Sequence, residues 1–245
     1  MGEHLETNSS REEKYTVPDW SRLEDNMVKI EQSLDRCQND GEPSTDKACL
    51  RSAKDDWDDQ LDVVYQSLMS DLNPATAKSL RDSERQWIKF QNEEETAIDT
   101  LLGKPGGNDV AAERARMELK RTRAEELRVP VSGYDVPDLG YPTADCLSRA
   151  TDSRSTNACY INRLNIAEGN MKGTYELLLS KLNPSERATL ISSQVEWRDF
   201  RDQENNYLHK LFRQRGAYVP AERIAAQVQI TEDRTKQFDF YLRNR

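Results

Sequence analysis

The segment SDLNPATAKSLRDSERQWIKF, residues 70–90, recurs as SKLNPSERATLISSQVEWRDF at residues 180–200. The two segments are 110 residues apart, and the same offset holds without a gap from Cys49 and Cys159 as far as Leu101 and Leu211. An ungapped match of this length indicates that the chain contains an internal duplication.

Both copies have the residue spacing of α-helices. Apolar residues between Cys49 and Leu72 recur every three or four positions, which places them on one side of a helix. Asn73-Pro74 and Asn183-Pro184 then separate two helices, because Asn is a good N-cap and Pro fits the first helical position. The sequence predicts an all-α fold of two tandem helical-hairpin or bundle domains.

The copies also predict the domain organisation. We expect a disordered tail at residues 1–16, a first domain at 17–128, a linker at 129–142 that is rich in Pro and Gly, and a second domain at 143–245. The first domain has an extra leading helix, at about residues 19–36, and a closing helix at about 111–128. In the second, helices end at 182, run from 184 to about 215, and start again near 221.

The composition excludes several classes of partner. The net charge of −9 argues against nucleic acid, which needs a basic surface, and fits a basic protein partner instead. The chain contains no run of about 18 apolar residues, so we expect no membrane insertion. It also lacks a phosphate-binding glycine loop, a nucleophile elbow and an HExxH motif. We therefore expect no enzyme activity, cofactor or metal.

The four cysteines form two close pairs, Cys37 with Cys49 and Cys146 with Cys159. Their short polar loops and their recurrence favour one disulfide within each copy, while zinc ligation and free buried thiols are the alternatives. Disulfides imply an oxidising compartment such as the periplasm. The polar start of the chain has no signal-peptide hydrophobic region, and it is also typical of a chain whose signal sequence has been replaced.

These motifs resemble the LprI family of lysozyme inhibitors. The cysteine pairs fit the family pattern, Leu61-Asp62-x-x-Tyr65 fits its second element, and Trp197-Arg-Asp-Phe200-Arg-Asp fits its third. The family's further cysteine is replaced by Glu95 and Asn205, so any second disulfide of the family is absent. The resemblance implies an envelope protein that binds and blocks a muramidase.

Several prominent residues have structural interpretations. The aromatic residues lie on apolar stripes and are expected in the bundle core: Tyr65, Trp87, Phe90, Tyr175, Trp197 and Phe200. Glu94 and Glu204 lie on the same stripes, so each should form an ion pair, for example with an arginine of the last helix. His209 has no counterpart in the first copy and is read as a surface residue.

The candidate binding residues lie in the first copy. Asp55, Asp56, Asp58, Asp59 and Asp62 form an acidic helix face, which is either a solvated surface or a docking patch for a basic enzyme cleft. In an up-and-down bundle the disulfide loop, 38–44, and the glycine-rich loop, 103–108, lie at the same end. The predicted partner-binding residues are Asn39, Asp40, Glu42, Ser44, Asp55, Asp58, Asp59, Lys104 and Asn108.

The sequence therefore predicts a non-catalytic periplasmic inhibitor of a lysozyme-like muramidase, which blocks the active-site cleft. Its partner is either a housekeeping enzyme or a secreted antibacterial toxin, in which case the chain is an immunity protein. A structural or sensory envelope module and a cell-wall enzyme are the alternatives.

Overall fold

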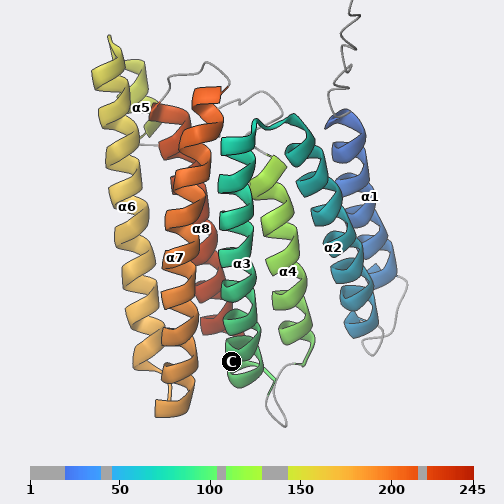
Figure 1. The fold of residues 1–245 in the computed structure, drawn as a ribbon. Coiled ribbons are helices and arrows are strands. Elements are labelled where there is room, and N and C mark those ends of the chain that lie inside the picture. The colour runs from blue at the N-terminus through green and yellow to red at the C-terminus, as the bar shows by residue number, and fades with distance from the viewer. Residues whose placement is uncertain (1–19, 40–45, 104–108, 129–142, 215–219) are drawn as a thin grey trace, which may run out of the picture.

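The computed structural model describes residues 20–39, 46–103, 109–128, 143–214 and 220–245. In these ranges every regular element is an α-helix, which confirms the all-α prediction (Figure 1). The helices are α1 (Trp20–Asn39), α2 (Asp46–Asp71), α3 (Pro74–Leu101), α4 (Asp109–Arg128), α5 (Thr143–Ser148), α6 (Ser153–Ser180), α7 (Pro184–Gln214) and α8 (Pro220–Asn244). The predicted tail at 1–16 and linker at 129–142 lie outside the described residues.

The repeated Asn-Pro step starts α3 and α7 in the same way. The side-chain oxygen of Asn73 accepts hydrogen bonds from the backbone N–H groups of Ala75 (3.1 Å) and Thr76 (2.9 Å). The side chain of Asn183 accepts two equivalent bonds, both of 3.0 Å, at the start of α7. Because these bonds satisfy N–H groups that have no partner within the helix, the cap prediction is confirmed in both copies.

The central pair of the fold joins the two copies, because α3 packs along α7 (Figure 1). These helices are antiparallel, and near their middle two residues of α3 meet their own counterparts in α7. Gln86 Nε2 donates to Glu196 (2.6 Å), and the Phe90 ring stacks on Phe200 with centroids 6.1 Å apart. Both pairs are 110 residues apart, so a local twofold axis passes between α3 and α7.

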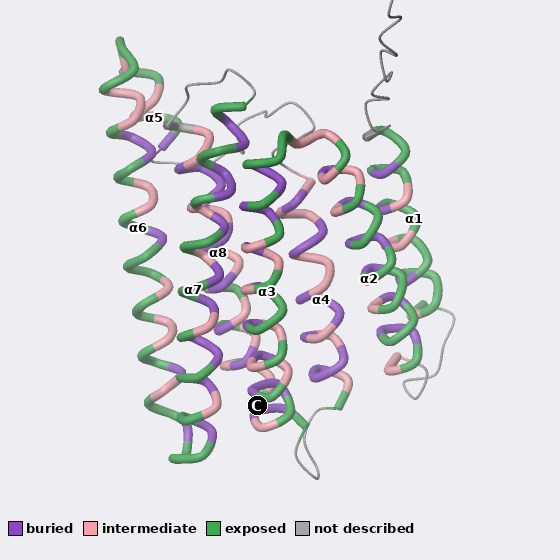
Figure 2. Tube along the Cα trace, viewed as in Figure 1, coloured by how far each residue is buried: buried purple, intermediate pink, exposed green. Residues whose placement is uncertain are grey.

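Two further helix pairs follow this symmetry. On one side α2 packs on α4, and on the other α6 packs on α8. The largest cluster of buried apolar residues contains Leu23, Trp57 and Trp87 of the first copy together with Trp197 and Phe200 of the second. The copies therefore share a core, which follows the inward faces of the helices in Figure 2.

Both predicted disulfides are present. Cys37 is bonded to Cys49, which ties α1 to α2, and Cys146 is bonded to Cys159, which ties α5 to α6. No free cysteine remains, so the zinc and free-thiol alternatives are wrong. The first disulfide holds a 20-residue helix, whereas the second holds only the six residues of α5.

Candidate functional site

Glu94 of α3 is fully buried and is neutralised by the other copy. Arg234 of α8 places Nη1 2.9 Å from its carboxylate. Tyr241 donates a hydrogen bond of 2.5 Å to Glu94, and Ser193 donates another. The predicted ion pair with an arginine of the last helix is confirmed, and all three partners belong to the second copy.

Glu204 of α7 has the reverse arrangement. Arg123 of α4 lies 2.9 Å from its carboxylate, and Ser83 of α3 donates a hydrogen bond of 2.5 Å. Both partners belong to the first copy. Each buried glutamate is thus held by the arginine and the serine of the opposite copy, which locks the two copies together.

The two buried clusters differ in charge. Arg123 contacts three carboxylates, because Glu84 and Glu126 also accept hydrogen bonds from it. Around Arg234 the corresponding groups are uncharged amides, Gln194 and Gln237. Burial raises the pKa of Glu126 to about 8 and also raises the pKa of Glu84. Arg123 opposes both rises, but this one guanidinium is shared among three carboxylates.

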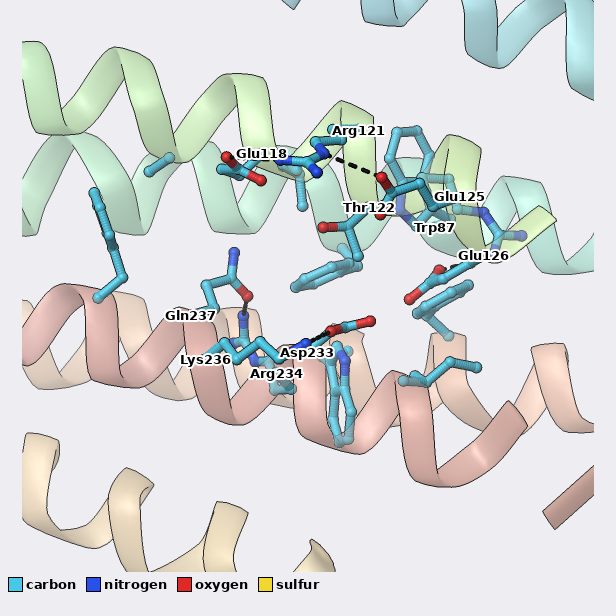
Figure 3. A pocket seen from close by; sticks show the side chains of 18 of the residues that line it. Trp87, Glu118, Arg121, Thr122, Glu125, Glu126, Asp233, Arg234, Lys236 and Gln237 are labelled. Atoms are coloured by element: carbon cyan, nitrogen blue, oxygen red, sulfur yellow. Dashed lines mark hydrogen bonds and ion pairs between the residues drawn. The ribbon is translucent and has the colours of Figure 1, made fainter. Parts of the chain in front are cut away.

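A cavity of about 450 Å³ lies on the local twofold axis between α4 and α8 (Figure 3). Trp87, Phe90, Trp197 and Phe200 are among its lining residues, but all four side chains are buried, as predicted. The guanidinium of Arg123 lies 4.9 Å from the centroid of the Phe200 ring. That of Arg234 lies 5.1 Å from Phe90. The protein's own cations thus occupy these ring faces, so we do not assign the cavity as a stacking site for a ligand.

The candidate binding surface is the acidic face of α2, formed by Asp55, Asp56, Asp58, Asp59 and Asp62. All five side chains are exposed. Asp58 pairs with Lys120 of α4 (2.6 Å), and Asp55 pairs with Lys54 (2.9 Å). In the described part of the chain the other three form no ion pair within 4.0 Å, so the face keeps a negative charge.

Lys120 also connects this face to the core. Its ammonium lies 5.2 Å from the centroid of the Trp87 ring, so Asp58 is held by a cation that itself rests on a buried aromatic ring. In the second copy Arg201 takes this place, at 5.2 Å from Trp197 and 3.5 Å from Glu168. The acidic face of α2 is therefore linked through Asp58 and Lys120 to the buried core.

The loop residues are only partly placed. Asn39 is exposed at the last position of α1. Asp40, Glu42, Ser44, Lys104 and Asn108 lie outside the described residues. Lys47 and Asp109, which lie in the first turns of the helices after the two loops, form an ion pair of 3.0 Å, so these helix ends lie together. His209 is exposed, as predicted.

Comparison with known proteins identifies the repeat. The family profile described as lysozyme inhibitor LprI matches residues 37–127 and again residues 146–238, which together make up most of the chain. The chain belongs to the LprI family. Membership implies a lysozyme inhibitor, and hence a protein that binds an enzyme rather than acting as one.

A solved structure is similar to this LprI protein in fold. It is the crystal structure of an uncharacterized protein from Burkholderia thailandensis, with a TM-score of 0.55 and 20% sequence identity. The match covers 86% of this chain and 96% of the other. At this identity the likeness extends to the fold alone. No curated protein matches the chain.

The sequence did not reveal several residues of the buried clusters of this LprI protein. Ser83 and Ser193 keep the 110-residue offset and were detectable as a repeated inward-facing pair. Arg123 and Arg234 are 111 residues apart, so the ungapped alignment does not pair them.

None of the helices in the described ranges has both the length and the apolar composition that a membrane span requires.

Proposed function

We propose that this LprI protein is a periplasmic inhibitor that binds a lysozyme-like muramidase and blocks its active-site cleft. Family membership supports inhibition of a lysozyme. The two disulfides support an oxidising compartment, since such bonds persist outside the reducing cytosol. Inhibition then consists of covering the cleft and needs no catalytic group on the inhibitor.

The proposed binding surface is the acidic face of α2, and its exposed charge is the main observation in its favour. Asp56, Asp59 and Asp62 project into solvent without an ion pair among the described residues, and a basic enzyme would be attracted to them. At the corresponding positions of α6 the second copy has Asn165, Ile166, Glu168, Gly169 and Lys172. In this proposal the first copy supplies the docking face, and Asn39 together with the helix starts at Lys47 and Asp109 lies near one end of it.

The test is inhibition of peptidoglycan cleavage, followed by binding kinetics. Purified protein should stop the loss of turbidity caused by at least one muramidase in a panel of periplasmic and secreted enzymes. Asp56→Asn, Asp59→Asn and Asp62→Asn together should slow association at low salt and have less effect at high salt, because exposed charges are screened over about 8–10 Å at physiological ionic strength. Surface plasmon resonance at two salt concentrations measures this.

The matched control removes the same charge elsewhere. Asp25, Asp199 and Asp239 are exposed on other helices, and the triple change of these residues to Asn should leave association almost unchanged. Equal slowing by both triple variants would refute the acidic docking face. Failure to inhibit every muramidase in the panel would refute the proposed function itself.

The partner enzyme distinguishes two forms of this function. If the panel includes a toxin muramidase encoded beside the gene of this protein, selective inhibition of that toxin supports an immunity protein. Inhibition of the producer's own hydrolases supports a housekeeping inhibitor. Binding to an envelope protein without any inhibition of cleavage would support a structural or sensory module instead.

A further inference from the structure

Each copy of the repeat surrounds one cation with a carboxylate and a tryptophan ring. In the first copy the ammonium of Lys120 lies 2.6 Å from the carboxylate of Asp58 and 5.2 Å from the centroid of the Trp87 ring. Its third contact is the side-chain oxygen of Gln91, at 3.2 Å. The Gln91 amide is itself oriented, because its Nε2 donates a hydrogen bond of 2.8 Å to Glu95. We call Asp58, Trp87 and Gln91 the first cation cage.

The second copy has the same ring and carboxylate but a different cation. The counterparts at the 110-residue offset are Trp197 and Glu168. The guanidinium of Arg201 lies 5.2 Å from this ring and 3.5 Å from this carboxylate. Arg201 belongs to α7, whereas Lys120 belongs to α4, so the two cations are not counterparts in the repeat. The copies therefore share a site for a cation, and not one particular cation.

Lys120 is held less firmly than the arginines of the core. The side chains of Arg123 and Arg234 are fully buried, and each neutralises a buried glutamate. The side chain of Lys120 is 12% exposed, and that of its partner Asp58 is 52% exposed. Water competes for an ion pair at the surface, and lysine has a flexible stem that lets its ammonium move aside. A second cation that reaches Asp58 can therefore take its carboxylate from Lys120.

The surroundings of the first cation cage attract a further cation. Asp59 and Asp62 follow Asp58 on α2, and both are exposed. Neither forms an ion pair within 4.0 Å with any residue of the described ranges. At the equivalent positions of α6 the second copy has Gly169 and Lys172. The negative charge that would draw in a basic partner is thus present only around the first cage.

We propose that the first cation cage is an anchor point on the acidic face of α2, where a lysine or arginine side chain of the partner takes the place of Lys120. The inference rests on the proposed function, since the partner is the basic muramidase that this face attracts. An ammonium and a guanidinium both suit such a cage, because Lys120 and Arg201 occupy the two copies of it. Asp58 supplies the charge, and Trp87 supplies the ring face that Lys120 now covers. Lys120 is then an internal competitor that the partner displaces.

The first test measures whether the cage binds a small cation, and it needs no enzyme. Lys120→Ala empties the cage and leaves its three walls in place. Butylammonium has the length and the charge of the lost side chain. At a concentration of about ten times its dissociation constant it should raise the melting temperature of Lys120→Ala by roughly 2–4 °C relative to sodium at the same ionic strength. The parent chain should show no such difference, because Lys120 fills its cage.

The control for this test removes the carboxylate as well. In the double variant Lys120→Ala with Asp58→Asn, butylammonium and sodium should have equal effects on the melting temperature. This control separates binding in the cage from a general effect of the amine on the protein, since only the charge of Asp58 differs between the two variants.

The second test measures binding of the muramidase by surface plasmon resonance. Lys120→Ala should lower the dissociation constant about two- to fivefold, because the partner no longer has to displace a surface ion pair. Structural damage at the interface would have the opposite sign. Butylammonium should weaken the complex of Lys120→Ala more than sodium does, since it competes for the same cage. Arg201→Ala is the matched control: it removes a cation from the second copy and should leave the dissociation constant unchanged.

Two results would overturn the proposal. One is an equal effect of butylammonium and sodium on Lys120→Ala, which would mean that the empty cage has no affinity for a cation. The other is unchanged or weaker binding of the muramidase by Lys120→Ala; weaker binding that Lys120→Arg restores would make Lys120 a support for Asp58 and not its competitor. If no muramidase binds the parent chain, the proposed function fails, whereas the butylammonium test still shows whether the cage binds cations.

Discussion

Glu126 offers a direct test of the unequal buried clusters. The structure places it beside Arg123 at 3.1 Å, with only 9% of its side chain exposed. Burial raises its pKa from 4.5 to about 8. Its counterpart beside Arg234 is Gln237, which accepts the same type of hydrogen bond (2.5 Å) without a charge. Glu126→Gln therefore converts the first cluster into a closer copy of the second.

The sign of the effect follows from proton binding. Between pH 4.5 and about 8 the folded protein holds a proton on Glu126 that the unfolded chain has released. The free energy of unfolding therefore falls as pH rises through this window. Each pH unit contributes about 1.4 kcal/mol, so full linkage at pH 7 would amount to about 3 kcal/mol. Water reaches the partly exposed carboxylate, and we expect Glu126→Gln to stabilise by about 1–3 kcal/mol at pH 7.

Urea unfolding followed by tryptophan fluorescence at pH 4.5, 6, 7 and 8 measures this effect. The difference between Glu126→Gln and the parent chain should be near zero at pH 4.5 and should grow with pH. Gln237→Glu is the matched control and should destabilise the protein at high pH, because it adds a buried carboxylate to the second cluster. If Glu126→Gln destabilises the protein at pH 8, or if the difference does not change with pH, the reasoning is wrong.

Two further predictions concern the links that hold the copies and helices together. Cys37→Ser or Cys146→Ser should lower the free energy of unfolding by roughly 2–5 kcal/mol in urea titrations under oxidising conditions; no change in a variant would mean that the bond adds no constraint. Glu94→Ala should cost roughly 3–5 kcal/mol because it leaves Arg234 buried without its carboxylate. The double variant Glu94→Ala with Arg234→Met should recover part of that loss of stability. If the changes in the free energy of unfolding of the two single variants simply add in the double variant, the two residues are not coupled.

The helices were predictable because their signals are local. Apolar spacing marked the stripes, and Asn73-Pro74 and Asn183-Pro184 marked the starts of α3 and α7. The disulfides were predictable because the close cysteine pair occurs twice. The helix ends differ from the prediction by a few residues, for example at Asn39, because helix ends are weakly determined by sequence.

The pairing between copies was not predictable. Glu94 and Glu204 were recognisable as inward carboxylates that need partners. A repeat does not reveal whether equivalent groups pair within a copy or across copies, because both arrangements satisfy the same local pattern. The one-residue shift between Arg123 and Arg234 also removed the arginines from the register of the repeat. The acidic face of α2 was readable from the sequence, and its role in binding stays a prediction.

The exchange of arginines between copies has a consequence for stoichiometry. Neither copy neutralises its own buried glutamate, so the chain is built as two tethered halves of a dimer. A dimer of identical halves must present each surface twice. Fusion in one chain removes that constraint, and here five aspartates of α2 stand where α6 has a single carboxylate, Glu168. The proposed docking face therefore occurs once per chain, and we expect the protein to bind its enzyme one to one.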